Sequence, residues 1–98
     1  MHATIVYNRA MAYQNIPKEK CPHIGEIKIT ESDKKTCSVC EVTEHLRQCT
    51  SCGQVFCCES HNAHNKKHFE ETGHPIIKSH NAPYDFYWCY TCNGYLVM

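Results

Sequence analysis

Twelve cysteine and histidine residues of this 98-residue chain lie at spacings typical of zinc ligands. Structural zinc takes four such side chains in a tetrahedron, and a C-x2-C pair is a common part of its ligand set. Twelve ligands therefore predict three zinc ions whose coordination positions are all filled by protein. The predicted ligands are Cys21, His23, Cys37, Cys40, Cys49, Cys52, Cys57, His64, His68, His74, Cys89 and Cys92.

The nine cysteines are interpreted as metal ligands rather than disulfide partners. Three C-x2-C pairs, at positions 37/40, 49/52 and 89/92, suit a metal ion and make poor disulfides. Eight histidines accompany them, which a disulfide framework does not need. The first residues also lack the basic segment and long apolar run of a secretory signal peptide. We therefore expect a reducing, cytoplasmic location.

The size and charge of the chain exclude several classes of function. A 98-residue chain is one domain with a modest core, and metal ions commonly stabilise domains of this size. The formal net charge is zero and the pI is about 7.1, so the basic surplus of a nucleic-acid-binding module is missing. No apolar run approaches the roughly 20 residues that a membrane span needs. We expect a monomer that binds neither nucleic acid nor membrane.

Several histidines and one cysteine are harder to assign from spacing. His64 and His68 are four residues apart in a predicted helix, so their rings share a face, and spacing alone would put them on one ion. His61 competes with His64 as a ligand. Cys58 is the spare cysteine, expected to be buried as a small hydrophobic residue. The histidines without a ligand partner at useful spacing are interpreted as ordinary side chains: His2, His45 and His80.

The elements that must position these ligands follow from the sequence pattern. Residues 1–20 are expected to form an N-terminal arm, either docked on the domain or available as a strand for a partner. Residues 21–98 are expected to form the zinc-binding domain. Gly53 follows a zinc knuckle, where a sharp bend requires positive φ. Strands are predicted over residues 25–30, 54–57, 76–79 and 86–90.

One helix is predicted over residues 60–72. Ser60 or Asn62 is the expected N-cap, because each offers a side-chain oxygen to the first turn. Gly73 suits the C′ position and Pro75 prevents the helix from continuing. This helix carries the histidines of the central metal region.

The ligand spacing resembles that of a known family. The ligand pattern is similar to that of the UBP-type zinc finger. It begins with C-x-H and continues with C-x2-C, C-x2-C, x4-C, x6-H, x3-H, x5-H and W-C-x2-C. This ubiquitin-binding finger is attached to many deubiquitinases and to one class of histone deacetylase. The similarity runs from Cys21 to about Tyr95. The stretches Leu46-Arg47-x-Cys49 and Cys57-Cys58-Glu59-Ser60 look more like stand-alone microbial versions.

The resemblance implies a small α+β fold, in which a twisted antiparallel sheet carries a packed helix. It also implies three interleaved zinc sites, with His64 and His68 on neighbouring ions. The implied ligand sets are Cys37/Cys40/Cys57/His64, Cys49/Cys52/His68/His74 and Cys21/His23/Cys89/Cys92.

In the binding members of this family, a narrow pocket receives the free C-terminal Gly-Gly of ubiquitin. The resemblance places Trp88, Tyr90 and Tyr95 at the positions of the pocket aromatics. Their flat walls would leave room only for glycine, and tyrosine adds a hydroxyl donor for a carboxylate. From the pattern alone, these rings would suit a core equally well.

Two positions depart from the binding members. The binding members usually carry Gly-Arg after the ligand corresponding to Cys57, whereas this chain has Cys58-Glu59. They also carry a Trp two residues before the ligand corresponding to Cys49, whereas this chain has Arg47. An Arg–carboxylate contact is worth about 1.5–3 kcal/mol, or about ten- to a hundredfold in affinity. Glu59 beside a carboxylate would add repulsion. Arg47 is the candidate replacement charge.

The leading interpretation is a non-catalytic module that recognises the Gly-Gly tail of ubiquitin or a ubiquitin-like protein. The alternative is a structural protein–protein interaction domain without a functional tail pocket, which Glu59 favours. An enzyme is disfavoured, because a catalytic zinc keeps an open position and twelve ligands for three ions leave none. Cys58 and His61 lack a third orienting group for nucleophilic catalysis.

Overall fold

The computed structural model describes residues 14–58 and 61–98. A six-stranded sheet forms its centre, in the order β1-β6-β5-β4-β2-β3. The strands are β1 Gln14–Pro17, β2 Leu46–Cys49, β3 Val55–Cys57, β4 Ile76–His80, β5 Tyr87–Cys89 and β6 Gly94–Val97. All neighbours are antiparallel except β1 and β6, so the expected α+β fold is confirmed with a mixed sheet.

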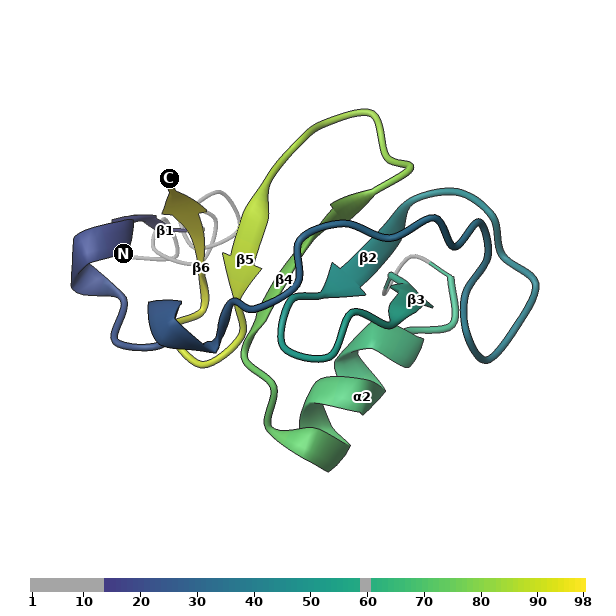
Figure 1. The fold of residues 1–98 in the computed structure, drawn as a ribbon, viewed down its shortest axis with the longest axis horizontal. Coiled ribbons are helices and arrows are strands. Elements are labelled where there is room, and N and C mark those ends of the chain that lie inside the picture. Colours follow the sequence, from purple (N-terminus) through teal and green to yellow (C-terminus); the bar gives the residue numbers. More distant parts are fainter. Residues whose placement is uncertain (1–13, 59–60) are drawn as a thin grey trace, which may run out of the picture.

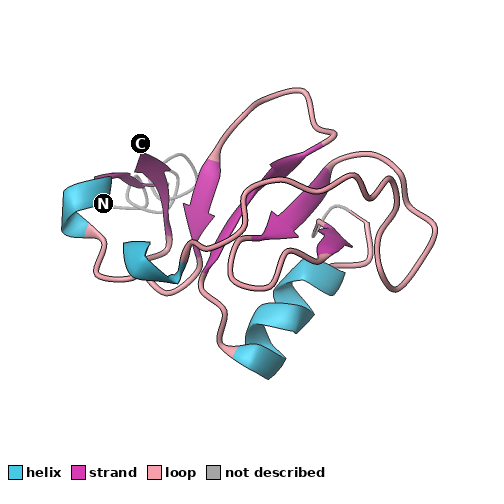
Figure 2. Cartoon of the chain, in the orientation of Figure 1, coloured by secondary structure: helices cyan, strands magenta, loops and turns pink. Residues whose placement is uncertain are grey.

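The helix α2, His64–Thr72, lies against the β3 end of the sheet (Figure 1). Two short 3-10 helices, η1 Lys18–Lys20 and η2 Ile24–Glu26, follow β1 (Figure 2). Residues 1–13 of the predicted arm lie outside the described residues. The part of the arm that is described forms β1 and η1, and Gln14–Pro17 of β1 pair in parallel with Gly94–Val97.

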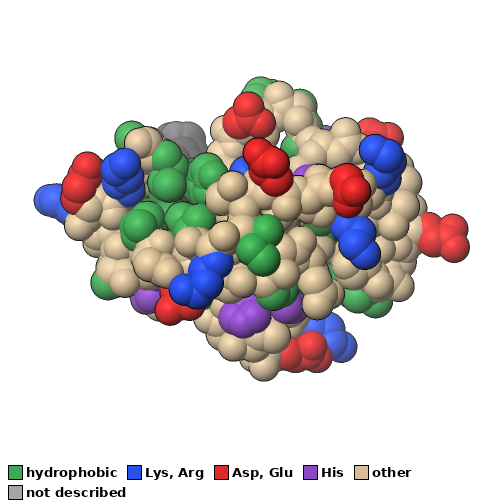
Figure 3. All heavy atoms as spheres, in the orientation of Figure 1, with side chains coloured by type: hydrophobic (Ala, Val, Ile, Leu, Met, Phe, Trp, Pro, Cys, Tyr) green, Lys and Arg blue, Asp and Glu red, His purple; other side chains and the backbone are tan. Residues whose placement is uncertain are grey.

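Two small apolar clusters stand in place of one large core. One surrounds Leu46, Val55 and Phe56 near α2. The other surrounds Ile76 and Leu96 near β1 and β6, where hydrophobic side chains also gather on the surface (Figure 3). Zinc-ligand cysteines belong to both clusters, so the predicted metal sites lie inside the packing that holds the sheet. Within the described residues, no helix is long and apolar enough to cross a membrane.

The predicted helix begins later than expected. Asn62 is not its N-cap, and Ser60 lies outside the described residues. Ala63 precedes the first helical residue with φ 56°, and its N–H donates to the Cys58 carbonyl oxygen at 3.0 Å. That turn holds residue 63 in a left-handed conformation, so the helix cannot start before His64. The predicted end is confirmed, because Gly73 has φ 78° and its N–H donates to the Phe69 carbonyl oxygen.

The strand predicted over residues 25–30 is wrong. Ile24–Glu26 forms η2, and the N–H groups of Lys28 and Ile29 both donate to the Thr50 carbonyl oxygen at 2.8 Å. Two donors on one acceptor tie this segment to the knuckle loop without forming a ladder. Gly53 has φ 84°, as predicted, and a Cβ there would lie 3.2 Å from the Ile29 side chain.

Candidate metal centres and aromatic pocket

The structure brings the twelve predicted ligands into three clusters of four. Within each cluster the ligand atoms lie within 4.8 Å of one another. All nine cysteines lie among the described residues and are free of disulfides. The clusters are Cys37, Cys40, Cys57 and His64; Cys49, Cys52, His68 and His74; and Cys21, His23, Cys89 and Cys92.

The distances within the clusters fit tetrahedral zinc. Zn–S and Zn–N bonds of about 2.3 and about 2.05 Å at tetrahedral angles put sulfur atoms about 3.8 Å apart and sulfur about 3.5 Å from nitrogen. In the first cluster, His64 Nδ1 lies 3.3 Å from Cys57 Sγ and 3.5 Å from Cys37 Sγ. The sulfur atoms of Cys40 and Cys57 are 4.0 Å apart. Zinc therefore fits this set of donors.

The second cluster joins the second knuckle to α2 and the loop after it. Cys49 Sγ lies 3.5 Å from His74 Nδ1, and Cys52 Sγ lies 3.5 Å from His68 Nε2. The two ring nitrogens are 3.3 Å apart, which matches two imidazoles on one tetrahedral ion. His64 and His68 thus serve different ions, although spacing alone would have placed them together.

The third cluster closes the domain by joining the segment before η2 to the β5–β6 turn. His23 Nδ1 lies 3.7, 3.5 and 3.4 Å from the sulfur atoms of Cys21, Cys89 and Cys92. The sulfur atoms of Cys21 and Cys92 are 3.7 Å apart across 71 positions of sequence. An ion here would hold together two segments that are distant in sequence.

The surroundings of the thiols differ between clusters. Hydrogen bonds from the Val42 backbone and then from the Asn62 amide lower the pKa of the Cys40 thiol to about 6. Burial raises the pKa of Cys89 to about 12. Burial also raises the pKa of Cys49 and lowers that of His68, which favours the neutral imidazole that zinc requires.

Trp88 and Tyr95 face each other across β5 and β6. They are cross-strand partners with ring centroids 4.9 Å apart. Tyr90 lies beyond β5 and stacks on Phe69 of α2 at 4.8 Å, and its hydroxyl accepts a hydrogen bond from Asn65 Nδ2 at 2.6 Å. The three predicted pocket aromatics therefore form one edge-to-face row, with Tyr90 at the helix end.

Arg47 lies on β2 beside this row. Its guanidinium carbon is 4.8 Å from the centre of the Phe86 ring, and Nη1 donates to the carbonyl oxygens of His45 and Leu46 at 3.1 Å. Arg47 also lines a hollow of about 390 Å³. Arg47 and Tyr95 are the two predicted pocket residues in its lining; Glu59 lies outside the described residues. The lining is His45, Arg47, Ala82, Pro83, Tyr84, Phe86 and Tyr95.

Sequence reasoning missed Phe86, Tyr84 and Asn65. Phe86 could have been found, because Phe86, Trp88 and Tyr90 alternate and so share one face of a strand. Tyr84 belongs to an irregular loop whose path no periodicity reveals. Asn65 looked like an exposed helix residue, yet it is fully buried. Cys58 is buried outside the three clusters, as predicted for the spare cysteine.

Three cysteine/histidine clusters interleaved on a small mixed sheet define a structural zinc finger. The family model of the zinc finger in ubiquitin hydrolases and other proteins (zf-UBP) matches residues 37–97. The chain belongs to this family.

Relatives and a solved structure agree with this assignment. The chain is 34% identical to ubiquitin carboxyl-terminal hydrolase 44 of Ailuropoda melanoleuca over 85 residues, covering 81% of this chain and 12% of that protein. It is 37% identical to NAD-dependent deacetylase sir2A of Dictyostelium discoideum, covering 72% and 12%. A solution NMR structure of protein RPA1320 from Rhodopseudomonas palustris has a TM-score of 0.67 and 34% identity, covering 76% and 78%. The chain thus spans about an eighth of the length of these curated relatives.

Proposed function

We propose that this zinc finger is a non-catalytic module that captures the free C-terminal Gly-Gly tail of ubiquitin or a ubiquitin-like protein. Its family supports a ubiquitin-related binding role, and the matched region is a zinc finger. The activities of the hydrolases and the deacetylase belong to proteins about eight times the matched length. We propose that the module acts as a monomer in a reducing, cytoplasmic environment, where its thiols stay available for zinc.

The hollow beside Arg47 is the observation that carries this proposal. Aromatic rings of Phe86, Tyr84 and Tyr95 form its walls, and one cation stands in its lining. Aromatic rings packed closely against an extended peptide leave room for glycine, which has no Cβ. A guanidinium favours a carboxylate ligand. A chain end with two glycines and a free carboxylate combines both properties.

Arg47 would supply the charge that binding relatives take from the position of Glu59. One Arg–carboxylate contact is worth about 1.5–3 kcal/mol. Nη1 of Arg47 already serves two backbone carbonyls, so the side chain is held in position before a ligand arrives. Glu59 would oppose a carboxylate, which supports modest affinity for the tail.

The test is a titration of zinc-loaded protein with two Gly-Gly-ended peptides, one with a free carboxylate and one amidated. We expect the free form to bind and Arg47→Gln to weaken it about tenfold or more, as loss of one charge-assisted contact predicts. Lys66→Gln removes an equal charge from an exposed position of α2 and should leave binding unchanged. Equal binding of the amidated peptide would contradict carboxylate recognition.

A structural interaction domain without a tail pocket is the second candidate. The hydrogen bonds from Arg47 to two backbone carbonyl oxygens favour this candidate. A guanidinium that holds the chain at the start of β2 has a structural role without any ligand. Failure of both peptides to bind the fully zinc-loaded protein would support this alternative.

A further inference from the structure

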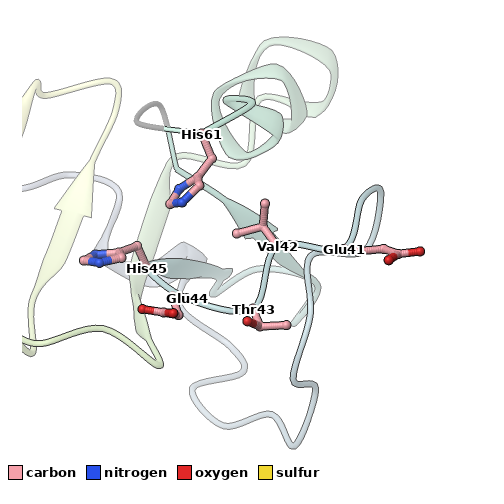
Figure 4. Close-up of a pocket in the computed structure, with 6 residues that line it drawn as sticks. All are labelled: Glu41, Val42, Thr43, Glu44, His45 and His61. Atoms are coloured by element: carbon pink, nitrogen blue, oxygen red, sulfur yellow. The ribbon is translucent and has the colours of Figure 1, made fainter.

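A second hollow, of about 600 Å³, lies on the other side of His45. Its lining is Glu41, Val42, Thr43, Glu44, His45 and His61 (Figure 4). His61 enters from the loop before α2, and the segment that carries Glu44 and His45 forms the opposite wall. None of the twelve zinc-cluster residues is in this lining. The lining thus contains two imidazoles and the Glu44 carboxylate beside them, none of which the zinc scaffold uses.

The buried Cys58 stands next to His61. Its Sγ lies 3.6 Å from His61 Nδ1. Cysteine–histidine pairs within the three zinc clusters show Sγ–N distances from 3.3 to 3.7 Å. The spacing of Cys58 and His61 is therefore that of two ligands on one ion, although this pair belongs to none of the clusters.

His45 supplies a second imidazole from the same hollow, and its ring must move to complete the set. The ring centroids of His45 and His61 are 6.0 Å apart, compared with 5.2 Å for His68 and His74, which share a zinc cluster. Both rings are on exposed residues, so a side-chain rotation of His45 would close the difference at little cost. The His45 backbone is held at φ 54°, with its N–H donating to the Asn81 carbonyl oxygen at 3.0 Å.

We propose that Cys58, His61 and His45 form a fourth metal site, which takes an exchangeable divalent transition-metal ion. One thiolate and two imidazoles suit borderline ions such as Zn²⁺, Co²⁺ and Ni²⁺ rather than Mg²⁺ or Ca²⁺. Three protein ligands leave a position for water or for the Glu44 carboxylate, facing the hollow. The carboxylate of Glu44, next to His45 in the chain, adds negative potential that favours a cation. Two of the three ligands are exposed and one coordination position is not filled by protein, so this ion should exchange more readily than an ion with four protein ligands.

Cobalt added to the protein loaded with three zinc ions tests the site. We expect one equivalent of cobalt to bind without release of zinc, both metals being counted by elemental analysis. A thiolate-to-cobalt charge-transfer absorption should appear, because Cys58 becomes a ligand. Cobalt binding with release of an equal amount of zinc would overturn the proposal, as would no binding.

Three variants locate the ion. Cys58→Ala should abolish the charge-transfer absorption, and His61→Asn should weaken cobalt binding at least tenfold. His45→Asn should weaken it similarly without harming the fold, because asparagine tolerates the left-handed backbone at that exposed position. His80→Asn removes a histidine outside the hollow and should change nothing. Retention of three zinc ions shows that each variant is folded; unchanged cobalt binding in His45→Asn and His61→Asn would sink the proposal.

Discussion

At the scale of single residues, Tyr90 links the aromatic row to the helix. Its ring stacks on Phe69, and its hydroxyl accepts the amide hydrogen of the fully buried Asn65. The Oδ1 atom of Asn65 has no hydrogen-bond partner within the described structure. A side chain with these contacts stabilises the fold as well as shaping any pocket, so Tyr90→Ala would test both properties at once.

Tyr90→Phe separates these two roles. It keeps the stacked ring and removes the hydroxyl that accepts a hydrogen bond from the buried Asn65 Nδ2. We expect the free energy of unfolding of the zinc-loaded protein to fall by about 1–3 kcal/mol. Denaturant unfolding measures this change. Tyr87→Phe, which removes a hydroxyl from a half-buried neighbour on the opposite face of β5, is the control and should cost less.

The ligands themselves were the most predictable residues. A C-x2-C pair fixes two donors on one tight turn, so local sequence identifies them. The assignment of His64 and His68 to different ions depends on how α2 lies against β3, which spacing does not contain. The same limit applies to Arg47, whose orientation depends on contacts with Phe86, 39 positions away in the sequence.

At the scale of elements, β1 is held to β6 by a close backbone approach. Gly94 pairs with Gln14, and a Cβ on Gly94 would lie 2.6 Å from Ile16 Cδ1 and 3.0 Å from the Gln14 carbonyl oxygen. A larger residue would have to shift the Ile16 side chain and move slightly away from the Gln14 backbone. The N-terminal strand therefore depends on a residue at the far end of the chain.

Gly94→Ala should loosen the pairing of β1 with the sheet while the three zinc sites remain. The added methyl group overlaps the end of the Ile16 side chain and crowds the Gln14 carbonyl oxygen, so we expect a cost of about 1–3 kcal/mol. Hydrogen exchange should become faster at residues 14–16 and stay slow in β2 and β4. Gly25→Ala, where a Cβ meets nothing within 4 Å, is the matched control. Unchanged protection of residues 14–16 would contradict the close approach.

Elements were less predictable than ligands. The helix end at Gly73 follows from local chemistry, but its start follows from the left-handed Ala63, whose N–H donates to the Cys58 carbonyl oxygen. The strands β2 and β6 were missed because each is four residues long and contains a cysteine or a glycine instead of an apolar alternation. Their pairing with β4 and β5 makes them strands.

At the scale of the whole molecule, two sites with the same donors differ in their surroundings. Each offers three thiolates and one imidazole. Burial raises the pKa of Cys89 to about 12 and also raises that of Cys92, whereas the Val42 backbone and Asn62 lower that of Cys40 to about 6. Burial also raises the pKa of Cys57, which belongs to the same site as Cys40. The difference in thiol pKa between the two sites therefore comes from Cys40.

Acid should therefore empty the site of Cys89 and Cys92 before the site of Cys37 and Cys40. A thiol with a higher pKa holds its proton more strongly against the metal, so its zinc leaves at a higher pH. The site of Cys40 should keep its ion to lower pH, because this thiol holds its proton less strongly against the metal. Alkylation at stepwise lower pH, read by mass spectrometry, should label Cys89 and Cys92 first. Earlier labelling of Cys37 and Cys40 would reverse the assignment.

The 71-residue separation of Cys21 and Cys92 has a consequence for synthesis on the ribosome. The other two sites span 27 and 25 positions, from Cys37 to His64 and from Cys49 to His74. These two can load zinc once His74 has left the exit tunnel, while Cys21 and His23 still wait for the last two ligands. During that interval an incomplete pair of thiol and imidazole is exposed, so the nascent chain must avoid capturing the wrong metal, or another chain's cysteines, until its own C-terminal turn arrives.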